Sequence, residues 1–404
     1  MVGLSLHKLL TIARGRRAFC ALLCAAGAIA LTACVGNNSP FLSDTPPQQP
    51  ASGAPAASTL GEGQVRVGLI LPLSASGNAG LAALAMKNAA DMALAEFKNP
   101  NIQLLVKDDA GTPQAAQLGA QQAVAEGAEI IIGPLFAQSV SAAAQVARGR
   151  NIPVIAFSTD TTVASRGVYL LSFLPEADVK RIVDYAVSRG KRSFAALLPD
   201  NAYGGVVEAA FQQEVAKHGG RVVALERYPL DPSKMADPVR RVAQAATHAD
   251  VIFIPDNADA ARIVQTLGAS GVNLKRVQLL GTGLWEDPRI FASPQLDNAW
   301  YAAPDPAGFR NFAARYRARY GQDPVRTAAL AYDAVALVAA LVKTQGPQRF
   351  SEQVLTNSSG FSGIDGIFRF RPDGTNERGL AVLRVTPKGA QVISPAPRAF
   401  APGM

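Results

Sequence analysis

The chain has 404 residues and a formal net charge of +8, from 39 basic and 31 acidic residues. Four of the basic residues lie within the first 17 positions, so 35 remain against 31 acidic residues in the rest of the chain. We find no basic cluster interleaved with aromatic residues, which argues against a protein that binds nucleic acid. The length is enough for two domains, each with its own hydrophobic core.

The N-terminus has the pattern of a bacterial export signal. Its basic first 17 residues precede an apolar run over 18–31, which is shorter than the roughly 20 residues that span a bilayer. The run ends in Leu31-Thr32-Ala33-Cys34, which resembles the lipobox that directs acylation of its cysteine. We therefore predict a signal peptide over 1–33 and lipidation at Cys34. The alternative is an ordinary signal peptide with a chance cysteine.

The segment that follows Cys34 predicts a tether. Residues 34–63 begin with this cysteine and are rich in Pro, Ser, Ala, Gln and Gly without hydrophobic periodicity, which is typical of disorder. Because Cys20 and Cys24 fall within the signal, a mature chain would keep Cys34 alone, and a disulfide or a cysteine-ligated metal is excluded. In a source with two membranes, the absence of Asp after Cys34 implies, by resemblance to other lipoproteins, anchoring at the outer membrane.

Strand-like and helix-like segments alternate from residue 64 onward. Strands are predicted over 65–71, 102–107, 129–133 and 153–157, and helices over 80–97, 113–126 and 139–149. This repeated order of strand and helix requires a parallel sheet that is covered by helices on both faces.

A second series of the same kind begins with an amphipathic helix predicted over 175–189. Strands over 193–198, 221–228, 250–254 and 277–281 follow, with helices over 203–218, 239–246 and 258–267. The last third adds helices over 308–320 and 327–344 and short strands over 367–371, 380–386 and 391–393. We therefore predict an α/β fold with two doubly wound parallel-sheet lobes, a hinge and a ligand cleft.

The domain boundaries follow if the two helices of the last third belong to the first lobe and its short strands belong to the second. Lobe 1 then comprises 64–171 and 304–356, and lobe 2 comprises 172–303 and 357–395, with a tail over 396–404. In this arrangement the chain crosses between the lobes three times.

Four segments resemble the type I periplasmic binding proteins, in particular the leucine/isoleucine/valine-binding family. They are 67–74 (VGLILPLS), 107–116 (KDDAGTPQAA), 128–135 (AEIIIGPL) and 152–158 (IPVIAFS). Tyr203-Gly204 and 331–334 (AYDA) also fit, so the resemblance extends over 65–393. Within this superfamily, 133–139 (GPLFAQS) and 169–173 (YLLSF) look more like the lipoprotein branch of penicillin-binding-protein activators.

The resemblance implies two functions, and the sequence alone leaves both open. The first is a solute-binding component of an ABC-type uptake system, which closes about a hinge and delivers a leucine-like or other amino-acid-like ligand to an inner-membrane permease. The alternative is an outer-membrane lipoprotein that activates a penicillin-binding protein, with a peptidoglycan synthase as its partner and a cell-wall fragment as its ligand. Both imply a lipid-anchored protein of the periplasm.

Open parallel sheets bind ligands beyond the carboxyl ends of their strands, where helix N-termini offer N–H groups to a carboxylate. Three loops of the first lobe meet this condition. The second lobe adds three candidate segments, and the resemblance implies that the aromatic residue at the position of Tyr203 lies against the ligand. The candidate ligand-binding residues are Ser74, Ser76, Phe136, Ala137, Ser139, Ser158, Thr159, Asp160, Tyr203, Asp256, Asn257 and Trp285. The alternative is structural: serine and threonine are good helix N-caps, Tyr203 could pack at a helix start, and Trp285 could fill surface.

Two positions depart from the pattern of the amino-acid binders. Those proteins offer a serine where this chain has Ala137, and they place an acidic residue for the ligand ammonium in the loop after Gly281. That loop here reads Thr282-Gly283-Leu284-Trp285, with Glu286 only nearby. A buried ammonium without a carboxylate partner is costly. The departures therefore argue against an α-amino acid while leaving a small ligand open.

The sequence carries no enzymatic signature. It has no Walker A loop, no HExxH and no GxSxG motif. The two histidines beyond the signal, His218 and His248, lie at polar helix ends and are interpreted as solvated. The carboxylate pair Asp108-Asp109 falls in a loop that the family uses structurally. We therefore predict a binding protein, not an enzyme, with no cofactor and no metal.

Overall fold

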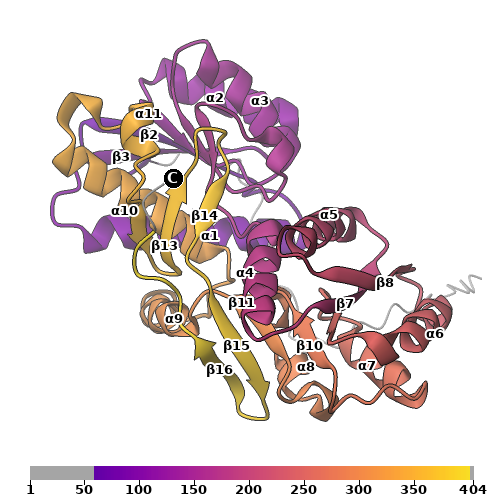
Figure 1. The fold of residues 1–404 in the computed structure, drawn as a ribbon. Helices are drawn as coiled ribbons and strands as arrows, with labels where there is room; N and C mark the ends of the chain where they lie inside the picture. The colour runs from indigo at the N-terminus through magenta and orange to yellow at the C-terminus, as the bar shows by residue number, and fades with distance from the viewer. Residues whose placement is uncertain (1–58, 401–404) are drawn as a thin grey trace, which may run out of the picture. The chain divides into compact units, whose positions relative to one another are not determined.

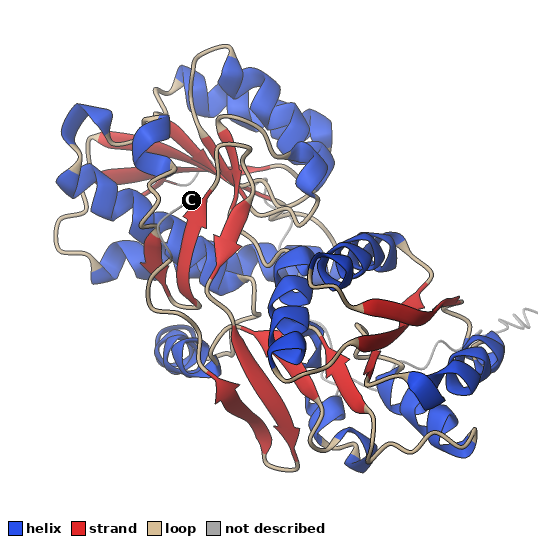
Figure 2. Cartoon of the chain, in the orientation of Figure 1, coloured by secondary structure: helices blue, strands red, loops and turns tan. Residues whose placement is uncertain are grey.

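The structure is a computed structural model that describes residues 59–400 (Figures 1 and 2). The predicted signal peptide, Cys34 and most of the predicted tether lie outside the described residues. The tether was predicted too long, because Thr59–Leu60 (β1) pairs antiparallel with β3. In the described part of the chain, no helix is long and apolar enough to cross a membrane.

The first sheet has six strands in the order β1-β3-β2-β4-β5-β6. Beside β1 they are β2 (Val65–Leu71), β3 (Ile102–Asp108), β4 (Ile130–Ile132), β5 (Val154–Ala156) and β6 (Val168–Leu170). All pairs except that of β1 are parallel. Strand β6 was not predicted, because only a 3-10 helix (Thr161–Val163) separates it from β5, in place of the α-helix that the alternation of strands and helices leads one to expect.

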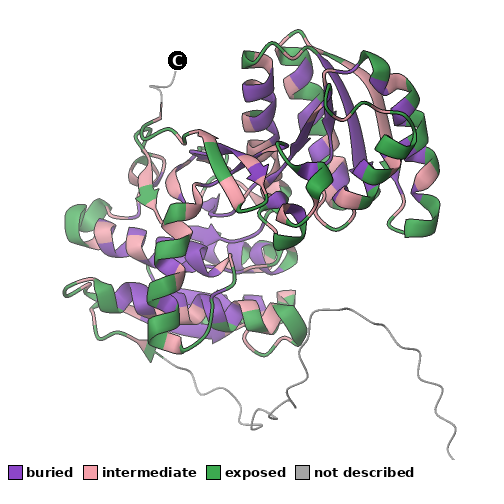
Figure 3. Ribbon diagram, turned by 90° about the horizontal axis from the view of Figure 1, so that it is seen from below, coloured by how far each residue is buried: buried purple, intermediate pink, exposed green. Residues whose placement is uncertain are grey.

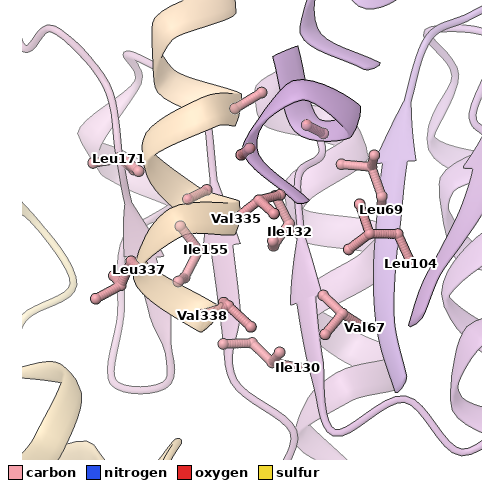
Figure 4. Packing of buried hydrophobic residues seen from close by; sticks show 14 of the residues in the cluster. Val67, Leu69, Leu104, Ile130, Ile132, Ile155, Leu171, Val335, Leu337 and Val338 are labelled. Atoms are coloured by element: carbon pink, nitrogen blue, oxygen red, sulfur yellow. The ribbon is translucent and has the colours of Figure 1, made fainter. Parts of the chain in front are cut away.

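Helices cover both faces of this sheet. One face carries α1 (Gly77–Glu96) and α10 (Ala328–Thr344), and the other carries α2 (Pro113–Ala125) and α3 (Ala137–Arg148). Figure 4 shows Val335 and Val338 of α10 packed on the strands of the sheet. Since both faces are covered, the strands are apolar throughout, and Figure 3 shows strands buried along their length beside helices that are buried on one side.

The second sheet has seven strands in the order β16-β15-β11-β10-β9-β7-β8. Its parallel strands are β7 (Ser193–Pro199), β8 (Arg221–Tyr228), β9 (Val251–Phe253), β10 (Gln278–Gly281) and β11 (Trp300–Ala303). Strands β15 (Ala381–Thr386) and β16 (Gly389–Ser394) join its edge antiparallel.

The second sheet is also covered on both faces. Helices α4 (Pro175–Ser188) and α5 (Ala202–Lys217) pack on one face, and α6 (Ala236–Ala245) and α7 (Ala260–Ala269) pack on the other. The short helix α8 (Pro288–Phe291) follows the β10 loop. The predicted α/β fold with two mostly parallel sheets is thus confirmed.

The C-terminal third adds elements to both sheets. Helix α9 (Pro306–Tyr320) packs beside α1, and α11 (Glu352–Leu355) follows α10. A separate three-stranded sheet is formed by β12 (Phe361–Gly363), β13 (Gly366–Phe370) and β14 (Asn376–Arg378).

The position of β13 differs from the expectation that placed 357–395 with the second lobe. Phe368 and Phe370 belong to the core of the first sheet, and the ring centroid of Phe370 lies 5.3 Å from that of Tyr169. The side-chain amide of Asn376 donates to the carbonyl of Leu170 at 2.7 Å, which ties the small sheet to β6. In this part of the chain only β15 and β16 join the second sheet.

A buried charge cluster lies where β14 leads towards β15. Arg378 is 6% exposed; its Nε donates to the carbonyl of Ser172 at 3.0 Å, and its guanidinium lies 4.8 Å from the ring centroid of Phe173. The carboxyls of Asp333 and Asp365 are buried nearby and attract it. Burial raises the pKa of Asp333 to about 7, although the N–H of Ile364 and the charge of Arg378 oppose the rise.

We expect Asp333 to make the protein less stable as the pH rises from about 4 to about 7. The folded carboxyl keeps its proton up to a pKa of about 7, against 3.8 for the ordinary group. The folded state therefore binds more protons than the unfolded state in this pH range. The stabilisation that this gives is fully present below the unfolded pKa and is lost as the pH rises through the folded pKa. Between pH 5 and pH 8, titration of Asp333 should lower the free energy of unfolding by about 3 kcal/mol.

Urea unfolding of the wild type and of Asp333→Asn at both pH values measures this contribution. The asparagine keeps an oxygen for the N–H of Ile364 but carries no titrating proton. The variant should lack this part of the pH dependence. An identical pH dependence in the two proteins would show that Asp333 titrates normally.

Candidate ligand-binding site

Each sheet has one point at which the order of its strands reverses. In the first sheet, β3 lies on one side of β2 and β4 on the other, so the reversal falls between β2 and β4. In the second sheet it falls between β7 and β9. Ligands of open parallel sheets bind at such points, outside the carboxyl ends of the strands. Eight of the twelve candidate residues lie in the loops at these two points or in the first turn of the helix that follows: Ser74, Ser76, Phe136, Ala137, Ser139, Tyr203, Asp256 and Asn257.

The loops after β2 and β4 lead directly into α1 and α3. Ser76 and Phe136 occupy the N-cap positions of these helices, and neither makes a capping hydrogen bond with its side chain. The first N–H groups of both helices therefore lack a side-chain cap, and the helix dipoles favour an anion there. The purely structural interpretation, in which the Ser76 hydroxyl serves as an N-cap, receives no support from this geometry.

Close backbone packing brings these two loops together. Gly133, directly after β4, has a φ of +89°, and a Cβ on it would lie 2.0 Å from the carbonyl oxygen of Ile70 in β2. Glycine alone tolerates both conditions. Beyond it, Phe136 is exposed, Ala137 is half-buried, and Ser139 is fully buried within the first turn of α3.

The carboxylate pair after β3 holds the same edge in place. Asp108 accepts from the N–H of Ser74 at 3.1 Å and from that of Ala110 at 2.9 Å. Asp109 is fully buried and accepts from the N–H of Gly111 at 2.9 Å. Burial raises the pKa of Asp109, against the lowering effect of that hydrogen bond. Both carboxylates thus shape the loop and leave Ser74 exposed beside it.

The loop after β5 is shaped by its own polar side chains. The hydroxyl of Ser158, which is buried, accepts from the N–H of Asp160 at 3.1 Å. Asp160 in turn accepts from the N–H of Thr162 at 2.9 Å and begins a short 3-10 helix. Ser158 and Asp160 therefore have structural partners, whereas Thr159 is exposed to solvent.

On the second sheet, the polar groups near the reversal point form hydrogen bonds with side chains at the end of β8 and in the segment that follows β10. The hydroxyl of Tyr203 lies 2.9 Å from that of Thr282, and burial raises the pKa of Tyr203. Asp256 accepts from the hydroxyl of Tyr228 at 2.6 Å. The amide of Asn257 donates to Asp287 at 2.7 Å. Tyr203, Asp256 and Asn257 are all partly exposed, so they can still contact a ligand.

Trp285 lies in the core of the second sheet instead of on the wall of a cleft. It is fully buried, and its Nε1 donates to the carbonyl of Asp256 at 2.9 Å. A Cβ on Gly281 would lie 2.1 Å from its ring, so the ring packs directly on the end of β10. Leu284 and Glu286 are exposed in this loop, and Glu286 accepts from the hydroxyl of Tyr301 at 2.6 Å.

A cavity of about 850 Å³ lies elsewhere, between α4, α5 and β14. None of the twelve candidate residues lines it. The reversal-point loops are therefore candidates apart from this cavity: those of the first sheet present helix N-termini that suit an anion, and those of the second present aromatic and polar side chains.

Two open α/β sheets with polar loops at both reversal points are an arrangement suited to binding a small ligand. Residues 64–390 match the periplasmic binding proteins, and the chain belongs to this family. It is accordingly a binding protein and not an enzyme.

Solved structures with the same fold include two transport proteins. The structure of a putative branched-chain amino acid ABC transporter from Rhodospirillum rubrum has a TM-score of 0.73 and 21% identity, and covers 81% of this chain and 99% of its own. The ABC transporter substrate-binding protein from Desulfitobacterium hafniense in complex with Leu has a TM-score of 0.60 and 18% identity, with the same coverage. At these identities the likeness shows the fold.

The curated relatives include a different kind of protein. The penicillin-binding protein activator LpoA of Serratia proteamaculans is 29% identical over 123 residues, which are 30% of this chain and 18% of that protein. The curated relatives that match do so over 18% to 34% of their own length.

Proposed function

We propose that the chain is the solute-binding component of an ABC-type uptake system, held in the periplasm by a lipid at Cys34. The observation that carries the proposal is the pair of N-termini without side-chain caps, those of α1 and α3, at the reversal point of the first sheet. Membership of the periplasmic binding proteins and the fold shared with ABC transport proteins support it. Incorporation of labelled palmitate, and its loss in Cys34→Ala, tests the anchor.

We propose that each sheet with its helices acts as one lobe, and that the lobes close on the ligand. The chain passes between the sheets at 172–174, 304–305 and 379–380, and these segments would form the hinge. Closure is driven by contacts that the ligand makes in the closed form alone. The inner-membrane permease would then recognise the closed form.

The chemistry of the site favours an apolar carboxylic acid. The N-termini of α1 and α3 suit a carboxylate, and the exposed side chains of Phe136 and Leu284 suit an apolar body. Asp256 and Glu286 already accept hydrogen bonds from Tyr228 and Tyr301. A ligand ammonium would have to share these carboxylates, so an acid without an amino group should bind at least as well as an amino acid.

Thermal unfolding of the purified protein with leucine, benzoate and soluble peptidoglycan fragments tests this function. A ligand at 100 times its dissociation constant adds about 2.7 kcal/mol and raises the midpoint of unfolding. We expect such a shift with leucine or benzoate, and a smaller one in Phe136→Ala. The matched control is Leu118→Ala, which removes an exposed apolar side chain from α2 (55% exposed, against 39% for Phe136).

The second candidate function is activation of a peptidoglycan synthase, which the similarity to LpoA favours. Absence of a shift with both acids, together with co-purification of a cell-wall synthase, would replace the uptake proposal with this one. A shift that is as large in Phe136→Ala as in the wild type would place the ligand away from the candidate site.

A further inference from the structure

Three side chains on α4 and α5 bring metal-ligating atoms together, away from the candidate ligand-binding site. Nε2 of His218 lies 2.5 Å from Oδ1 of Asp184 and 4.0 Å from Oε2 of Glu214. The three ligand atoms all lie within 4.8 Å of one another, and all three side chains are half-buried. His218 was interpreted from the sequence as solvated, and the structure corrects this.

Helix geometry explains the convergence. Glu214 and His218 are four residues apart at the end of α5, so their side chains lie on one face, one turn apart. Helix α4 packs along this face and supplies Asp184. Lys180 donates to Oδ2 of Asp184 at 2.5 Å, which leaves Oδ1 directed at the imidazole. The lysine therefore orients the carboxylate in the way that an outer-shell partner orients a metal ligand.

We propose that Asp184, Glu214 and His218 bind a divalent transition-metal ion of the zinc type. One imidazole and two carboxylates suit Zn²⁺, whereas Mg²⁺ and Ca²⁺ prefer oxygen alone. With metal–ligand bonds of 2.0–2.2 Å, two atoms on one tetrahedral ion lie about 3.4 Å apart. The distances of 2.5 Å and 4.0 Å lie on either side of this value, so the side chains must rotate to bind an ion. Glu214 must then share Oε2 with Lys217, which donates to it at 3.1 Å.

Asp184 and Glu214 line the cavity of about 850 Å³, which gives an ion access to the three side chains. Three protein ligands would leave a fourth position for water or for a group in the cavity.

Titration calorimetry with zinc chloride on the purified protein tests the proposal. We expect one Zn²⁺ per chain, with affinity at least about tenfold lower in His218→Ala and in Glu214→Gln. The matched control is His248→Ala, which removes the histidine at the end of a separate 3-10 helix and should bind zinc as the wild type does.

A second variant and a spectroscopic measurement keep the test decisive if His218→Ala does not fold. Should His218→Ala fail to fold, Glu214→Gln keeps the size of the side chain and carries the test alone. Cobalt(II) should give the visible absorption of a tetrahedral site in the wild type and lose it in that variant. Absence of zinc binding by the wild type, or equal zinc affinity in Glu214→Gln, would show that the three residues form an ion-pair network only.

Discussion

Replacing Arg378 with methionine is expected to lower the free energy of unfolding by about 3–5 kcal/mol. The guanidinium is buried with the carboxyls of Asp333 and Asp365, and it offsets their charge. Methionine keeps most of the packing against Phe173 and Phe368 but removes the cation. Arg326, which lies 2.5 Å from Asp365, would then be the remaining cation of the cluster. Denaturant unfolding at pH 8, above the pKa of about 7 that Asp333 has beside Arg378, measures the loss.

The control for this variant is Arg371→Met on the same hairpin. Arg371 pairs with Glu377 at 3.3 Å and its side chain is 48% exposed, so its loss should change stability by at most about 1 kcal/mol. Adding Asp333→Asn to Arg378→Met should restore part of the stability, because it removes one uncompensated carboxylate. A loss below about 1 kcal/mol in Arg378→Met would mean that the cluster does not depend on this cation.

Truncation of Trp285 to alanine is expected to destabilise the protein by about 3–5 kcal/mol. The ring is fully buried, packs on Gly281 and lies 6.4 Å from the ring centroid of Tyr301. Its loss opens a cavity and leaves the carbonyl of Asp256 without the indole N–H. Trp285→Phe should cost less, about 1–3 kcal/mol, because most of the apolar ring surface remains while the donor is lost.

Leu284→Ala is the matched control, since it removes the exposed neighbour and should change stability by about 0.5 kcal/mol at most. Urea unfolding measures all three variants. If Trp285→Phe is as stable as the wild type but binds ligand more weakly, Trp285 contacts the ligand and does not serve the core alone.

The long elements could be predicted from the sequence because each carries its own periodic signal. The helix predicted over 175–189 is α4 (Pro175–Ser188), with Val179, Ile182 and Val183 buried on one face. Strands β6, β11 and β14 were missed because they are short and no helix longer than four residues separates any of them from the strand before it. Alternation in β13 predicts an apolar face for Phe368 and Phe370, but it does not tell which core receives them.

The sequence predicts which loops form the candidate site, but not which side chains of these loops are buried and which are exposed to a ligand. The order of strands and helices places the loops at the reversal points, because ligand sites follow from topology. Whether Trp285 faces a ligand or the core depends on the space above Gly281, which is a tertiary property. Likewise, the four-residue spacing of Glu214 and His218 is visible in the sequence, but Asp184 joins them only through the packing of α4 on α5.

Ligand-driven closure of the two lobes is the central claim, and small-angle X-ray scattering tests it most directly. Scattering is recorded from the purified protein alone and with a saturating amount of leucine or benzoate, whichever raises the midpoint of unfolding. Hinge closure predicts a smaller radius of gyration in the liganded protein at an unchanged molecular mass. Identical scattering curves from the free and the saturated protein would contradict it.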